Sequence, residues 1–200
     1  LPTLSASTVD AGNAVTITTN RADSSFTHDI SYSFGVLTNQ TSGLAASTGV
    51  GTSTTFTPPM ALLNQIPNAA SGVATITVVT KNSGGTVIGS RTVNLTITAP
   101  ASVVPTISSV SVPEATTTPD LASIVGTFVQ NLSRLDLDMV GEAGAYGSTI
   151  VSARLSVAGQ TINAATGTTP NPIGTSGTVT VNAEVTDSRG RVSSFAGQNI

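Results

Sequence analysis

Apolar and polar residues alternate along several stretches of the chain with the two-residue period of β-strands. In the first half, the apolar members of these stretches are Val15, Ile17, Ile30, Tyr32, Phe34, Val36, Val93, Leu95 and Ile97. In the second half, they are Leu135, Leu137, Met139, Val179, Val181, Ala183 and Val185. Serine and threonine fill many of the positions between them. This alternation predicts antiparallel sheets with one buried face and one solvated face.

Turn-forming residues separate the predicted strands. They occupy positions 10–13, 82–85 and 187–190, where Asp, Asn, Ser and Gly supply side-chain acceptors and tolerate positive φ. The last two groups lie between long predicted strands, so each predicts a hairpin near the end of a domain. That placement is typical of the last two strands of an immunoglobulin-like sandwich.

An internal repeat with a spacing of about 105 residues indicates two copies of one architecture. The dipeptide Ser71-Gly72 corresponds to Ser176-Gly177, and the turn at 82–85 corresponds to the turn at 187–190. We therefore predict an all-β chain of two tandem immunoglobulin-like antiparallel β-sandwich domains. Their expected ranges are 1–99 and 106–200, joined by a linker at 100–105 that has a proline near each end.

The segment 58–67 departs from the strand pattern because it is apolar and bounded by prolines. It has room for at most about two helical turns. We expect it to cross from one sheet to the other, with Leu62, Leu63 or Ile66 closing the end of the sandwich.

Composition narrows the possible functions. Charged residues make up 8% of the chain, the net charge is −3, and Lys81 is the single lysine. A surface of this kind does not attract nucleic acid. The absence of cysteine excludes disulfides, thiolate metal sites and a cysteine nucleophile. No apolar run has the length of a membrane span, so we expect no membrane insertion.

Few residues could carry chemistry. His28 is the single histidine, but no nucleophile motif accompanies it, so we interpret it as a solvent-facing or turn-supporting residue. Asp136 and Asp138 share one strand face with Glu142 nearby, yet this set offers too few oxygens for calcium and fits a solvated face better. We predict no catalytic residue, no metal and no cofactor.

Tyr146 is the one candidate ligand contact. It lies in the Gly- and Ser-rich stretch 144–148, where an aromatic ring is expected to be exposed. The alternative is a ring packed back over its own domain. The chain has 2 tyrosines, 5 phenylalanines and no tryptophan, and this small aromatic content weakens a general sugar-binding interpretation.

Five stretches resemble a family of minor structural proteins from siphophages of Gram-positive hosts. The stretches, in the order in which they occur in that family, are 56–72, 100–110, 128–135, 144–150 and 185–191. The resemblance implies a virion component at or near the tail tip that forms part of a longer polypeptide. It brings no catalytic residues with it.

The functional hypothesis that follows is a non-enzymatic structural and adhesive tail protein. Its expected partners are other phage tail proteins, including copies of itself in a homo-oligomer, and host wall polysaccharide. The first alternative is a bacterial cell-surface adhesin or glycan-binding module, and the second is an accessory domain of an enzyme.

Overall fold

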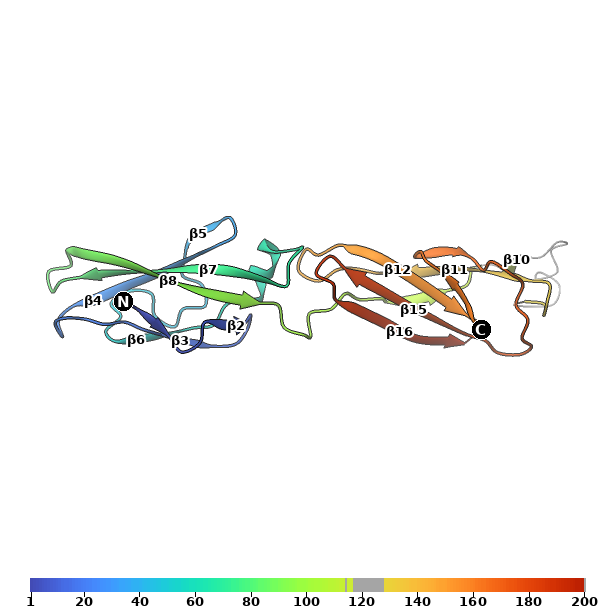
Figure 1. Ribbon diagram of the computed structural model, residues 1–200, viewed down its shortest axis with the longest axis horizontal. Coiled ribbons are helices and arrows are strands. Elements are labelled where there is room, and N and C mark those ends of the chain that lie inside the picture. The colour runs from blue at the N-terminus through green and yellow to red at the C-terminus, as the bar shows by residue number, and fades with distance from the viewer. Residues whose placement is uncertain (114, 117–127, 200) are drawn as a thin grey trace. The chain divides into compact units, whose positions relative to one another are not determined.

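The computed structural model describes residues 1–113, 115–116 and 128–199. In this part of the chain the structure is all-β apart from one short 3-10 helix (Figure 1). The chain divides into two compact units, Leu1–Ser102 and Val103–Ile200, which we call unit 1 and unit 2. The boundary falls inside the proline-bounded segment 100–105.

Unit 1 contains two sheets. One has the strand order β1-β3-β6 and the other the order β2-β8-β7-β4-β5. The elements are β1 (Thr3–Leu4), β2 (Thr8–Asp10), β3 (Val15–Thr18), β4 (Thr27–Phe34), β5 (Leu37–Gln40), β6 (Ser53–Phe56), the helix η1 (Met60–Gln65), β7 (Ser71–Lys81) and β8 (Val87–Thr98).

The core of unit 1 lies between these sheets. Alternate residues of β4 are buried, as the two-residue period predicts, and the same holds for β7 and the second half of β8. The rings of Tyr32 on β4 and Phe56 on β6 pack across the gap with their centroids 4.7 Å apart. Unit 1 is therefore a β-sandwich.

Val36 does not belong to the buried row in which we placed it. Its side chain is 86% exposed, because β4 ends at Phe34 and Gly35 turns the chain with a φ of 59°. An apolar residue at the right period can still fall beyond the end of a strand.

One strand pair in unit 1 is parallel, whereas the sequence predicted antiparallel sheets. β2 runs beside β8 with Val9 opposite Ile97. The segment after β1 leaves the three-stranded sheet and joins the edge of the five-stranded one. The first strands of unit 1 thus contribute to both sheets.

The proline-bounded segment forms the crossover that its sequence predicts. It contains η1, which connects β6 in the first sheet to β7 in the second. Leu62 and Leu63 of η1 are buried, while Ile66 just after it is half-buried. The apolar side chains of this short helix therefore complete the core of unit 1.

Unit 2 also contains two sheets. One has the order β10-β11-β14, with β9 also paired to β11, and the other has the order β13-β12-β15-β16. The strands are β9 (Ser109–Ser111), β10 (Ala115–Thr116), β11 (Arg134–Val140), β12 (Ile150–Val157), β13 (Gln160–Ile162), β14 (Thr166–Thr168), β15 (Thr180–Asp187) and β16 (Val192–Asn199).

A single apolar cluster joins the two sheets of unit 2. It contains the predicted inward rows of β11 and β15 together with Leu155 and Val157 of β12. Unit 2 is therefore a second β-sandwich. The order β13-β12-β15-β16 corresponds to β5-β4-β7-β8 of unit 1, where β2 is an additional edge strand, so the internal repeat extends beyond the hairpins.

The two predicted hairpins have one turn geometry. In unit 1, Asn82 Oδ1 accepts hydrogen bonds from the backbone N–H groups of Gly84, at 3.0 Å, and Thr86, at 2.9 Å. In unit 2, Asp187 Oδ1 accepts from the N–H groups of Arg189, at 3.0 Å, and Arg191, at 2.9 Å. The spacing of donors along the chain is the same in both turns.

Candidate functional site

The inward-facing rows of three neighbouring strands become polar at one end of unit 1. Along β4, β7 and β8 the buried residues are apolar over most of their length, and the rows then end at His28, Thr80 and Arg91. The sheet register places His28 opposite Thr80 and Arg91 opposite Val78. Polar side chains therefore line the gap between the two sheets at this end.

His28 is buried, with 1% of its surface exposed, so its interpretation as a solvent-facing or turn-supporting residue is wrong. It has the same strand parity as Ile30, Tyr32 and Phe34, and this parity directs its ring into the sandwich. Its Nδ1 lies 3.0 Å from Thr80 Oγ1. Its Nε2 is buried and has no hydrogen-bond partner in the described part of the chain.

Burial lowers the pKa of His28 from its ordinary value, and the positive charge of Arg21 lowers it further. The imidazole is consequently neutral at neutral pH. With Thr80 Oγ1 donating to Nδ1, Nε2 carries the proton and can donate a hydrogen bond. With the other tautomer, Nε2 is an acceptor.

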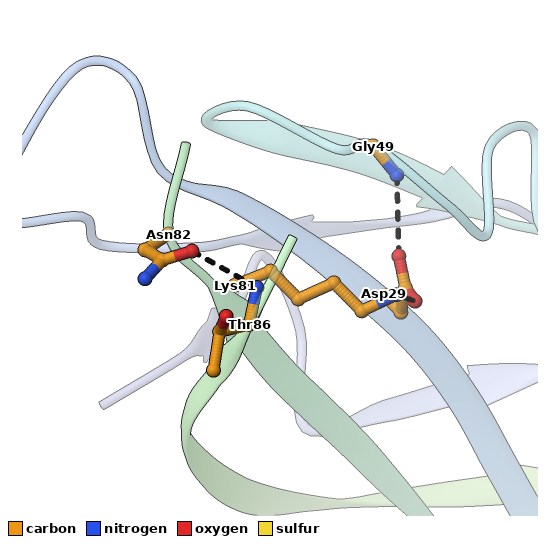
Figure 2. Close-up of polar contacts among 5 residues, drawn as sticks. All are labelled: Asp29, Gly49, Lys81, Asn82 and Thr86. Carbon is orange, nitrogen blue, oxygen red and sulfur yellow. Dashed lines mark hydrogen bonds and ion pairs between the residues drawn. The ribbon is translucent and has the colours of Figure 1, made fainter. Parts of the chain in front are cut away.

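The next residue, Asp29, lies on the opposite face of β4 and is held by an ion pair. Its Oδ2 is 2.5 Å from Lys81 Nζ, and its Oδ1 accepts a 3.3 Å hydrogen bond from the N–H of Gly49 (Figure 2). The hydrogen bond from Lys81 lowers the pKa of the Asp29 carboxyl. The single lysine therefore ties the end of β7, next to the hairpin turn, to β4.

Two neighbouring hollows that share lining residues open at the polar end of the sandwich. The inner one has a volume of about 50 Å³ and is lined by His28 together with Thr19 and Val78. The outer one has a volume of about 300 Å³ and includes Phe26 and Ile88. Asn20, Thr80 and Arg91 line both. We call the two hollows together the inter-sheet mouth.

Two arginines lie at this mouth. Arg21 Nη1 donates to the carbonyl oxygens of Ser24, at 2.6 Å, and Phe26, at 3.3 Å. Arg91 Nη1 donates to the carbonyl oxygen of Ser90 at 2.8 Å. Within the described ranges the ion pairs are Lys81 with Asp29 and Arg154 with Glu184, so neither mouth arginine takes part in one.

One carboxylate lies near Arg21. Asp23 Oδ1 accepts hydrogen bonds from the backbone N–H of Ser25, at 2.8 Å, and from Ser25 Oγ, at 2.7 Å. These bonds lower the pKa of Asp23, and Arg21 contributes the smallest part of that shift. The carboxylate is thus engaged mainly by its own loop.

No sequence pattern predicts that these residues meet. Arg21, His28, Thr80 and Arg91 belong to three strands and a loop, and the register of a nonlocal sheet brings them together. The one local signal is that His28 occupies the same alternating positions as its apolar neighbours on β4, which predicts an inward-facing side chain.

Tyr146 in unit 2 is 37% exposed and has a φ of 47°. Its carbonyl oxygen accepts a 2.7 Å hydrogen bond from Arg189 Nη2, and Arg189 Nη1 donates to the carbonyl oxygen of Ala145. Ser148 Oγ donates to the buried Asp187 Oδ2 at 2.9 Å. The backbone of the Tyr146 loop is therefore fixed to the β15–β16 turn, while Tyr146 itself remains partly exposed.

Asp136 and Asp138 lie on the face of β11 opposite its buried row, and both are half-buried. Asp136 Oδ1 accepts a hydrogen bond from Thr168 Oγ1. In residues 1–113, 115–116 and 128–199, no group of three or more His, Asp and Glu side chains is arranged to hold a metal ion. No helix in these ranges is long and apolar enough to cross a membrane.

Comparisons with known proteins give three findings. A family model described as a siphovirus protein of unknown function (DUF859) matches residues 1–200. No curated protein matches the sequence. Solved structures give weak likenesses: the fibronectin(III)-like modules of Clostridium thermocellum CbhA have 14% identity and a TM-score of 0.29, covering 100% of this chain and 91% of that one. The YadV chaperone has 9% identity and a TM-score of 0.30, covering 100% and 98%.

Proposed function

Because the chain belongs to the DUF859 family of siphovirus proteins along all 200 residues, we propose that it is a non-enzymatic structural part of the phage tail. In this role the two sandwiches act as immunoglobulin-like spacer or host-attachment domains at or near the tail tip. Their neighbours are other tail proteins, including further copies of this chain, and the surface they reach is the wall polysaccharide of a Gram-positive host.

The observation that carries this proposal is the way the exposed loops are fixed. Side-chain acceptors lock both long hairpins, and Arg189 fixes the Tyr146 loop by its backbone carbonyls. Binding surfaces that are ordered before contact lose less conformational entropy on binding. Rigid sandwiches with preformed loops therefore suit a spacer that presents a contact surface to its target.

Placement in the virion can be tested directly. Antibodies raised against the purified chain should label the tail in electron micrographs of intact phage. Labelling confined to infected cells, with none on the virion, would contradict a structural role. Labelling along the tail tube, away from the tip, would support the structural role but place the protein in the tube.

Attachment is tested by binding of the labelled chain to host cells and to their extracted wall polysaccharide. We expect saturable binding, and Tyr146→Ala should weaken it about tenfold because a stacking ring is lost. Tyr146→Phe keeps the ring and is the matched control. Absence of binding at about 50 µM would exclude attachment and leave the spacer role.

A further inference from the structure

The inter-sheet mouth gathers positive charge in a chain whose net charge is −3. Arg21 and Arg91 both line the outer hollow: Arg21 lies in the loop after β3, and Arg91 on β8. In the described part of the chain, each guanidinium donates only through Nη1, and only to backbone carbonyls. Each guanidinium has five N–H donors, so several remain for a ligand.

A buried histidine lines the inner hollow. His28 is 1% exposed, lines this hollow, and has a buried Nε2 without a hydrogen-bond partner among the described residues. A space of about 50 Å³ accepts a single oxygen-sized group.

The outer hollow has the size and lining for a sugar or polyol unit. Its volume is about 300 Å³, and it joins Phe26 and the half-exposed Ile88 to polar Asn20 and Ser90. Apolar side chains pack against the C–H faces of such units, and the amide and hydroxyl groups satisfy their oxygens. The outer hollow thus combines positive charge, polar groups and apolar surface.

We propose that the inter-sheet mouth of unit 1 binds an anionic oxyacid group, phosphodiester or carboxylate, carried on a sugar or polyol chain. The guanidinium groups of Arg21 and Arg91 donate to the oxyacid oxygens, a pairing that their planar forks favour. An oxygen of the ligand enters the inner hollow that His28 lines, and the sugar or polyol lies against Phe26 and Ile88. This inference rests on the proposed attachment function and names the polymer class that it recognises.

His28 provides the readout, because a single histidine gives a single set of imidazole resonances in an NMR spectrum of the whole chain. Three probes are titrated: a glycerol-phosphate oligomer, a glucuronic acid oligomer and a neutral glucose oligomer. We expect saturable shifts of the His28 signal with an anionic probe and none with the neutral one. The two anionic probes distinguish the phosphodiester from the carboxylate.

The matched variants are Arg91→Gln at the mouth and Arg154→Gln on unit 2. Arg91→Gln should weaken binding about tenfold, through loss of a charge-assisted hydrogen bond. Arg154→Gln removes one positive charge elsewhere and should leave affinity unchanged. Raising NaCl from about 0.05 M to about 0.5 M should weaken binding to the wild-type chain. Equal affinities for both variants, or no His28 shift with either anionic probe, would overturn the proposal.

Cell binding separates this inference from the attachment function. If the oligomer binds at the mouth and the cells do not bind, the site stands and attachment fails. If the cells bind without any effect of Arg91→Gln or any His28 shift, attachment stands and the site fails. If Arg91→Gln loses both oligomer binding and cell binding while Arg154→Gln keeps both, the site and the attachment function are both supported.

Discussion

The hairpin turns of the two units share a geometry but differ in charge and burial. In unit 1 the acceptor is the neutral amide of Asn82, which is half-buried, and its turn makes no contact beyond the hairpin among the hydrogen bonds described. In unit 2 the acceptor is the carboxylate of Asp187, which has 0% exposure and also accepts from Ser148. A local turn has thus become the anchor of a second loop in unit 2 alone.

This difference shows how a repeated motif can diverge in role. Exchange of an amide for a carboxylate strengthens each bond from a backbone N–H, and the second carboxylate oxygen is free to hold another segment. That segment carries Tyr146. The hairpin of unit 1 instead leads into the inter-sheet mouth, so each unit presents a different candidate contact.

The largest expected effect comes from removing the anchor. Asp187→Ala leaves the N–H groups of Arg189 and Arg191 and the hydroxyl of Ser148 without this acceptor, so it should destabilise unit 2 by about 3 kcal/mol. Asn82→Ala is the matched change and should cost unit 1 only about 1 kcal/mol. Denaturant unfolding monitored by hydrogen exchange measures both losses of stability and assigns each loss to a unit. Equal losses would show that burial and charge at the turn are unimportant.

A smaller effect should be the same in both units. Gly85 and Gly190 have φ values of 82° and 76°, and an added Cβ at either would meet no atom within 4 Å. Alanine at either position therefore costs only backbone strain, about 1 kcal/mol. Gly89→Ala, also in open space but without a positive φ, is the control and should cost less. Thermal unfolding of the three variants compares them, and a large asymmetry between the two turns would contradict their equivalence.

The smallest effect is a pH dependence confined to unit 1. Because the pKa of His28 is lowered in the folded protein, the unfolded chain takes up the proton first as pH falls below about 6.5. This contribution to the stability of unit 1 is fully present above that pH and is lost as the pH falls below about 6.5, while unit 2, which has no histidine, lacks it. The free energy of unfolding of the wild-type chain and of His28→Gln, measured at a series of pH values below and above 6.5, tests this prediction. A pH dependence that persists in the variant would exclude His28 as its source.

Most of the strand pattern could be predicted because it is local. The buried rows of β11 and β15 follow from the two-residue period, and the hairpins follow from their turn residues. The inter-sheet mouth could not be predicted, since Arg21 and Arg91 meet only through the packing of two sheets. Burial of Asp187 could not be predicted either, because a turn aspartate is ordinarily solvated and its contact with Ser148 joins positions 39 residues apart.

The parallel pair of β2 and β8 has a consequence for synthesis of the chain on the ribosome. Asp10 and Thr98 are 88 positions apart, and Thr98 Oγ1 donates a hydrogen bond to the Asp10 carboxylate. Contacts between such distant positions form late and slow folding. While β8 is still inside the ribosomal tunnel, β7 has an unpaired edge on which another nascent chain could dock. The emergence of residues 96–98 is therefore the step that completes unit 1 and closes this route to aggregation.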